Sequence, residues 1–135
     1  MQVLTLDTAT QLIRQAQAKA QDDFRRPICV AVCDAQGLLV AFARMEGAPV
    51  RSVAISQGKA YSAALMGVTT QAVLERLHRE GIQIGYFCDP QLTALPGGTP
   101  LKDQAGVLCG AIGVSGLTSA EDQQVTDHIA TLFAA

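Results

Sequence analysis

A glycine-spaced apolar run near the end of this chain limits it to folds in which a strand lies very close to another segment. Within Gly106–Gly116, glycine occupies positions 106, 110, 113 and 116. The apolar residues between them predict a central strand over 107–114, and glycine weakens a strand unless a neighbour needs the space. That neighbour is either a flat ligand or a helix packed tightly on the sheet. The run alone favours neither.

The segment just before this run, Pro96–Pro100, reads Pro-Gly-Gly-Thr-Pro. Its two prolines fix φ, and Gly97 and Gly98 between them can reach positive φ. The pattern predicts a stiff turn with exposed backbone amides. Such amides can donate to an anion or a carbonyl group, so Gly97 and Gly98 are candidate ligand-binding residues.

The composition indicates one globular domain over residues 1–135. The chain is 49% hydrophobic and 16% charged, which is enough for a real core. A chain this small and apolar often covers surface in an oligomer. The helix expected over 50–66 is rich in Ala and Ser, and such small side chains suit contact with another backbone. We therefore expect a homo-oligomer, at least a dimer.

Charge and hydropathy exclude other classes of protein. The net charge is −2 and the basic residues are scattered, so we expect no nucleic-acid partner. No stretch approaches the roughly 18 apolar residues of a membrane span, and the N-terminus lacks the pattern of a signal peptide. We expect a cytoplasmic protein without membrane contact. The cysteines lack metal-ligand spacing and are expected to be buried apolar residues: Cys29, Cys33, Cys88 and Cys109.

Capping and turn signals divide the chain into alternating elements. Asp7 or Thr8 is expected to cap a helix that runs to Phe24, and residues 28–44 are expected to form a hairpin. Helices follow over 50–66 and 70–81, then an irregular part over 82–105, the strand over 107–114 and a last helix capped by Ser119. Hairpins without repeated βαβ units predict an α+β fold, with an antiparallel β-sheet flanked by helices.

Four segments in this order resemble the GlcG/HbpS-like family, which also includes the C-terminal domain of PduO-type proteins. The segments are Val32–Ala48, Lys59-Ala60, Pro96–Pro100, and Gly110–Gly116 with Glu121-Asp122 behind it. The resemblance implies a profilin-like arrangement of the sheet and helices. It also implies assembly into multimers up to octamers, and a ligand that is heme in some members.

Heme needs an axial donor and a wide apolar slot. The chain has two histidines, His78 and His128, and helical spacing puts each at the rim of an apolar stripe. Rim histidines are usually partly exposed surface residues. Heme therefore remains a possible cofactor, and the roles of both histidines stay open.

Lys59 stands among small side chains in its expected helix, so it points either to solvent or into a cleft. The resemblance implies that it belongs to a site, where it could hold a carboxylate or, if desolvated, act as a base. Arg44, at the end of a strand, is either a carboxylate clamp or a solvated charge. Ser115 adds a hydroxyl donor. We expect an anion-selective pocket lined by Arg44, Lys59, Gly97, Gly98 and Ser115, with no acid paired to its cations.

Two hypotheses of function follow. The first is a small-ligand-binding protein that takes heme or another anionic cofactor. The second is a catabolic enzyme that uses the same pocket for isomerase, lyase or proton-transfer chemistry on a carboxylated or carbonyl substrate, with Lys59 or a histidine as base. The sequence contains no Ser-His-Asp order, P-loop or H-E-x-x-H motif. An absorption spectrum with added hemin separates the hypotheses.

Overall fold

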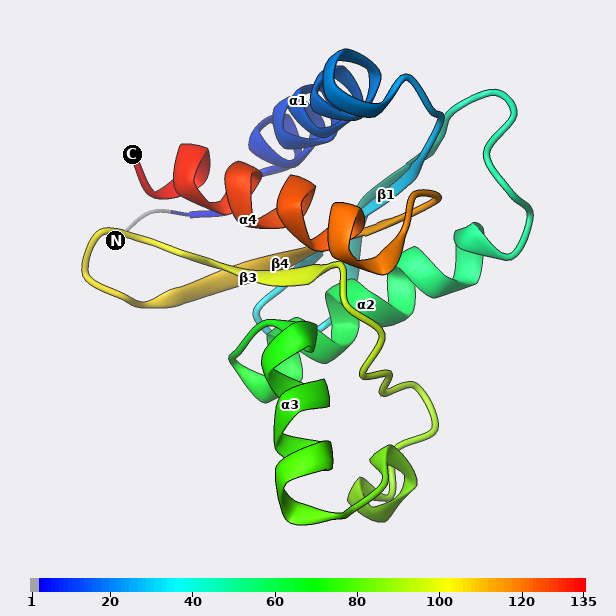
Figure 1. The fold of residues 1–135 in the computed structure, drawn as a ribbon. Coiled ribbons are helices and arrows are strands. Elements are labelled where there is room, and N and C mark those ends of the chain that lie inside the picture. Colours follow the sequence, from blue (N-terminus) through cyan, green and yellow to red (C-terminus); the bar gives the residue numbers. More distant parts are fainter. Residues whose placement is uncertain (1–2) are drawn as a thin grey trace.

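The computed structural model describes residues 3–135, which form four α-helices, one short 3-10 helix and four strands (Figure 1). In chain order these are α1 (Leu6–Phe24), β1 (Cys29–Asp34), β2 (Leu39–Arg44), α2 (Ser52–Met66), α3 (Thr70–Glu80), η1 (Ile84–Phe87), β3 (Gly98–Lys102), β4 (Leu108–Ser115) and α4 (Ser119–Ala134). The structure confirms the predicted α+β fold and the hairpin over 28–44. Within the described part of the chain, no helix is long and apolar enough to cross a membrane.

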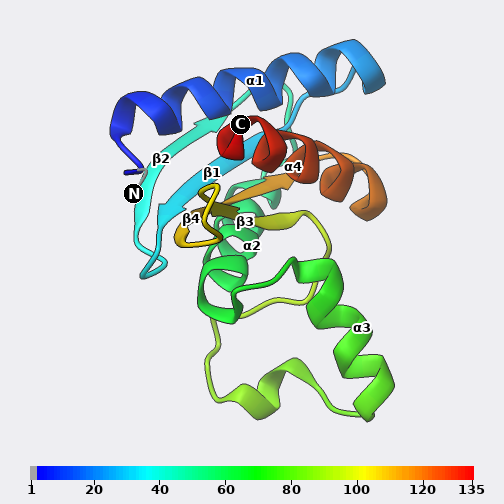
Figure 2. The same ribbon diagram turned by 90° about the vertical axis from the view of Figure 1, so that its left-hand side faces the viewer.

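The four strands form one antiparallel sheet in the order β2-β1-β4-β3. The helices α1 and α4 cover one face and α2 covers the other, which gives three layers (Figure 2). The glycine-spaced run lies in β4, a central strand, as predicted. The helices α3 and η1 project from one end of this layered body (Figure 1).

The two faces of the sheet bury side chains of different size. Toward α1 and α4 the strands present branched aliphatic residues such as Val30 and Ile112. Toward α2 they present Ala31 and Ala111, which pack with alanines such as Ala60 of the helix. Successive strand residues point to opposite faces, so each strand serves both layers. Small side chains on the second face let α2 lie close to the strands.

This close approach requires glycine at two strand positions. A Cβ at Gly113 would strike the backbone of Ser56 and Ala60, and a Cβ at Gly98 would strike the carbonyl of Lys59. A backbone cannot move aside as a flexible side chain can. For Gly113, tight packing of a helix on the sheet is therefore the explanation that the structure shows. A Cβ at Gly110 would instead strike the carbonyl of Cys33 in the neighbouring strand, and one at Gly106 would meet no atom within 4 Å.

The exposed turn expected over Pro96–Pro100 is absent. All five residues are buried, and Gly98 begins β3. The N–H of Gly97 donates to Oε1 of Gln123 (2.7 Å), and the N–H of Gly98 donates to Oγ1 of Thr70 (2.9 Å). Gly97 does adopt a positive φ of 126°. Proline and glycine set the local conformation of this segment. Side chains of α3 and α4 then accept hydrogen bonds from its backbone N–H groups, which allows it to be buried.

Two helix caps differ from the expectation. Thr5 caps α1 in place of Asp7 or Thr8, and Thr118 caps α4 in place of Ser119. Each threonine hydroxyl accepts from an N–H three residues later, which is the usual capping geometry. Several cap-forming residues stand in a row at both places, so the sequence fixes the helix start only to within a few residues.

The burial of the cysteines is only partly as expected. Cys29 and Cys33 are buried in β1, and Cys109 is half-buried. The expectation is wrong for Cys88, which is exposed and ends η1 with a φ of 61°. The surrounding segment, residues 82–105, has no periodic hydrophobic pattern, so the exposure of Cys88 could not be predicted from the sequence.

Candidate functional site

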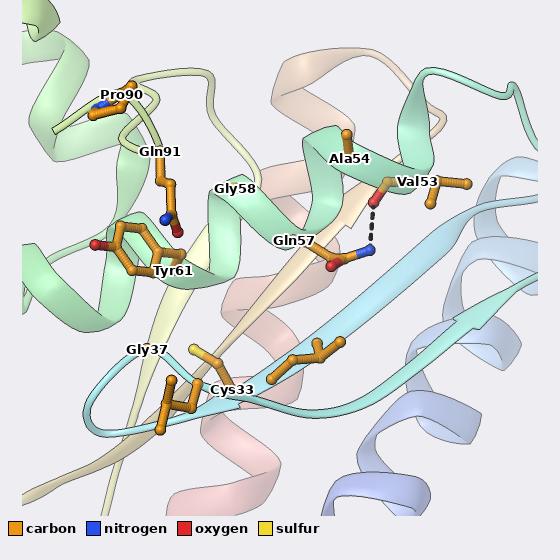
Figure 3. A pocket seen from close by; sticks show the side chains of 11 residues that line it. Cys33, Gly37, Val53, Ala54, Gln57, Gly58, Tyr61, Pro90 and Gln91 are labelled. Carbon is orange, nitrogen blue, oxygen red and sulfur yellow. Dashed lines mark hydrogen bonds between the residues drawn. The ribbon is translucent and has the colours of Figure 1, made fainter.

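Two hollows flank α2. The larger, which we call the apolar groove, lies between the β1–β2 hairpin, α2 and the loop after η1, and it has a volume of about 600 Å³ (Figure 3). Its lining residues are Cys33, Gly37, Leu38, Leu39, Val53, Ala54, Gln57, Gly58, Tyr61, Pro90 and Gln91. None of these residues is charged. The groove therefore offers an apolar surface to a ligand.

The polar side chains of the groove are neutral. Cys33 is 2% exposed, its sulfur points toward α2 in Figure 3, and burial raises its pKa to about 12. The Tyr61 hydroxyl donates to Oδ2 of Asp89 (2.5 Å), and this hydrogen bond raises the pKa of the phenol. Gln57 donates its amide N–H to the carbonyl of Val53 in its own helix (3.1 Å). A ligand in the groove meets a protonated thiol and an aromatic ring.

The smaller hollow, which we call the polar cleft, lies where the N-terminal part of α2 meets the end of β4 and the start of α4. Its volume is about 240 Å³. Its lining residues are Arg26, Pro49, Arg51, Ser52, Ile55, Lys59, Leu95, Ser115, Gly116, Leu117, Ser119 and Asp122. The cleft thus combines cations, hydroxyls and a carboxylate.

A buried ion pair lines the cleft. Nζ of Lys59 lies 3.0 Å from Oδ2 of Asp122 and donates to the carbonyl of Val114 (2.8 Å). The Leu117 N–H donates to Oδ1 of Asp122 (3.1 Å). Burial lowers the pKa of Lys59 and raises the pKa of Asp122, while the attraction between the two charges opposes both shifts. The expectation that Lys59 has no paired acid is wrong.

Sequence reasoning missed Asp122 as a site residue. It counted Glu121-Asp122 among the segments that resemble the family, but it did not assign Asp122 to the pocket. Lys59 and Asp122 are 63 residues apart, and no local pattern joins them. The available signal is indirect: a lysine in a helix of small residues needs a counter-charge if it is buried.

Ser115 lines the cleft together with Lys59. Its hydroxyl donates to Oγ of Ser52 (3.0 Å), the first residue of α2. Both serines are buried. A pair of hydroxyls carries two protons and uses one between them, so one O–H of the pair remains able to donate.

The other three residues predicted for the pocket lie outside the cleft lining. Arg44 is exposed, and its guanidinium donates from Nε and Nη2 to the carbonyl four residues later (3.2 and 3.0 Å). Gly97 packs against the ammonium of Lys59, where an added Cβ would come within 2.7 Å of Nζ. Gly98 packs against the backbone of Lys59. The structure thus brings Lys59 and Ser115 together in the cleft lining. Both glycines pack against Lys59, and Arg44 lies outside the lining.

The two histidines lie outside both hollows. His78 on α3 and His128 on α4 are exposed, as expected for residues at the rim of an apolar stripe. Among residues 3–135, no group of three or more His, Cys, Asp or Glu side chains could hold a metal ion.

Comparisons with known proteins cover most of the chain. Residues 4–130 match the family described as haem degrading protein HbpS-like. Protein GlcG of Escherichia coli K12 is 35% identical over 113 residues, which are 84% of this chain and 81% of GlcG. The family match and the sequence relative thus cover largely the same part of the chain.

Solved structures show the same fold. A double mutant of HbpS from Streptomyces reticuli superposes with a TM-score of 0.88 at 29% identity, covering 100% of this chain and 90% of that one. The crystal structure of a PduOC:heme complex superposes with a TM-score of 0.85 at 24% identity, covering 96% of this chain and 94% of that one. The three-layer architecture is thus shared along the whole domain.

Proposed function

Because this chain belongs to the HbpS-like family, we propose that it binds a small ligand and that heme is the leading candidate. The family description refers to heme, and a protein of the same fold has been crystallised as a heme complex. The observation in this molecule that carries the proposal is the apolar groove. Ligand sites are typically clefts of about 300–1,000 Å³ with mainly apolar walls, and the groove, at about 600 Å³, lies in that range.

The groove residues fit the body of a porphyrin better than its polar parts. Leu38, Leu39 and the ring of Tyr61 provide apolar surface for a flat macrocycle. Bound heme would supply redox chemistry at its iron. The side chains able to ligate the iron here are those of Cys33 and Tyr61. Each must first lose its proton, and its raised pKa opposes that loss. With no cation in the lining, the propionates would extend to solvent. We therefore propose that either residue would hold the iron only weakly.

Titration with hemin tests the groove directly. We expect a saturable shift of the Soret band with the wild-type protein. Leu39, 52% exposed on β2, can be changed to glutamate without burying a charge in the core. Leu39→Glu places a carboxylate against an anionic ligand at an apolar wall, so we expect hemin affinity to fall at least about tenfold.

A matched variant separates the groove from general surface effects. Leu132→Glu makes the same chemical change at a 41% exposed position of α4 that lines neither hollow, and we expect its affinity to equal that of the wild type. Absence of any Soret shift would contradict the heme proposal. Equal loss in both leucine variants, or loss of the Soret band in His128→Ala, would place heme outside the groove.

The alternative function is a small-molecule enzyme, and the Lys59–Asp122 pair is the observation that favours it. Burial lowers the pKa of Lys59, which moves the amine toward the range of a general base. In this alternative Lys59 is the catalytic base and Ser115 contacts the substrate in the polar cleft. The donors of Arg44 and the amides of Gly97 and Gly98 have acceptors within the protein, so a substrate role for them requires those bonds to break. A cytoplasmic location remains a prediction.

A further inference from the structure

The polar cleft contains hydrogen-bond donors that its own residues do not use. Lys59 has three N–H donors; within residues 3–135 they find two acceptors, the carbonyl of Val114 and Asp122. The Ser52–Ser115 pair keeps one O–H free to donate. Lys59 and both serines are buried. Each of these buried atoms already has a partner within the protein, and the spare N–H and O–H are the donors available to an acceptor in the cleft.

The charges around the cleft favour an anion as that acceptor. Three cationic side chains line the cleft (Arg26, Arg51 and Lys59) against one carboxylate, Asp122. Both oxygens of Asp122 already accept, one from Lys59 and one from a backbone N–H. The cations therefore outnumber the acid, and the acid offers little further hydrogen-bonding capacity.

The two arginines differ in how far they are engaged. Arg26 donates to the carbonyl of Gly116 (3.2 Å) and lies 3.8 Å from Glu121. The side chain of Arg51 makes no hydrogen bond or ion pair with residues 3–135, and only its carbonyl accepts, from the N–H of Ile55 (3.2 Å). It directly precedes Ser52, the first residue of α2, where the helix dipole adds partial positive charge. Arg51 is thus the cation most available to a ligand.

The size and the apolar part of the cleft limit the ligand. About 240 Å³ has room for roughly eight water molecules at ~30 Å³ each, which suits a small acid and is too small for a porphyrin. Ile55, Leu95 and Leu117 add an apolar wall for a short carbon body. We propose that the polar cleft binds the carboxylate of a small organic acid, with Lys59, Arg51 and the Ser52–Ser115 pair as donors.

This site is separate from the apolar groove. The two hollows share no lining residue, and they lie on different sides of α2. Binding of a carboxylate in the cleft therefore does not depend on heme binding in the groove. A failure to bind hemin would leave the carboxylate proposal standing, and the reverse also holds.

Nuclear magnetic resonance of the full chain tests the proposal with acetate as the probe. We expect acetate to shift the backbone amide signals of Ser52, Gly116 and Ser119 in a saturable manner. Acetamide has the same shape without the charge, and we expect it to leave these signals in place at the same concentration. Sodium chloride at matched ionic strength provides the baseline.

Arginine variants keep the test independent of the buried pair, whose alteration could unfold the protein. Arg51 is exposed, and we expect Arg51→Gln to weaken acetate binding about tenfold, since charge-assisted hydrogen bonds are the stronger ones. Arg79→Gln, at an exposed position on α3, should bind acetate as the wild type does. The proposal is overturned if acetate shifts none of these signals, if acetamide shifts them equally, or if Arg51→Gln binds acetate with unchanged affinity.

Discussion

Lys59 is a buried charge whose removal leaves another buried charge behind. Its side chain is 1% exposed and that of Asp122 is 3% exposed. Breaking a buried ion pair by removing one partner typically costs about 3–5 kcal/mol, because the remaining charge stays in a poorly solvating interior. We expect Lys59→Met to lower the free energy of unfolding by about this amount, measured by urea denaturation.

A second variant separates charge from packing at this position. In Lys59→Met combined with Asp122→Asn, the asparagine side-chain oxygen can still accept from the Leu117 N–H while the uncompensated charge is gone. We expect the double variant to recover most of the lost stability. A loss below about 1 kcal/mol in the single variant would mean that the pair contributes little. No recovery in the double variant would mean that the loss comes from packing and not from the uncompensated charge.

At the scale of elements, the contact between α2 and the sheet determines which residues the strands can carry. Gly98 lies against the backbone of Lys59 and beside Thr70 Cγ2, at 2.9 Å from the position of an added Cβ. Overpacking a close contact typically costs about 1–3 kcal/mol. We therefore expect Gly98→Ala to lower the melting temperature clearly, measured by circular dichroism.

Gly85 provides the comparison for this substitution. It lies in η1, and an added Cβ there would meet no heavy atom within 4 Å. Gly85→Ala should leave the melting temperature nearly unchanged. A Gly98→Ala protein as stable as the Gly85→Ala protein would show that α2 can move away from β3.

At the scale of the whole molecule, exposed apolar side chains replace the small residues of α2 as the reason to expect an oligomer. Ala60, Ala63 and Ala64 of α2 pack on the protein's own sheet, so they are not available to a second copy. Large apolar side chains remain exposed elsewhere, among them Leu38, Leu65 and Val68. Exposed apolar surface of this kind is often covered by self-association.

We therefore predict a homo-oligomer on the basis of this exposed apolar surface. Light scattering at micromolar protein concentration should give at least twice the mass of one chain. The family resemblance extends the expectation up to an octamer. A mass equal to one chain across the concentration range would refute it.

The sequence by itself determined the features that depend on near neighbours. The hairpin over 28–44, the helix that Thr69 caps and the central position of β4 follow from alternation, capping residues and turn residues. These signals act over a few residues, so a single chain displays them. They also sufficed to indicate the family, because the motifs occur in a fixed order.

Only the tertiary structure decided which segments meet. It showed that Gly97 and Gly98 are covered, that Arg44 stands apart from Lys59, and that Asp122 neutralises Lys59 from 63 residues away. Sequence patterns rank a residue as polar, small or helical, but they do not say which surface will lie opposite it. That outcome depends on how three layers share one sheet, since burying α2 and α4 against the same strands is what brings the lysine and the aspartate together.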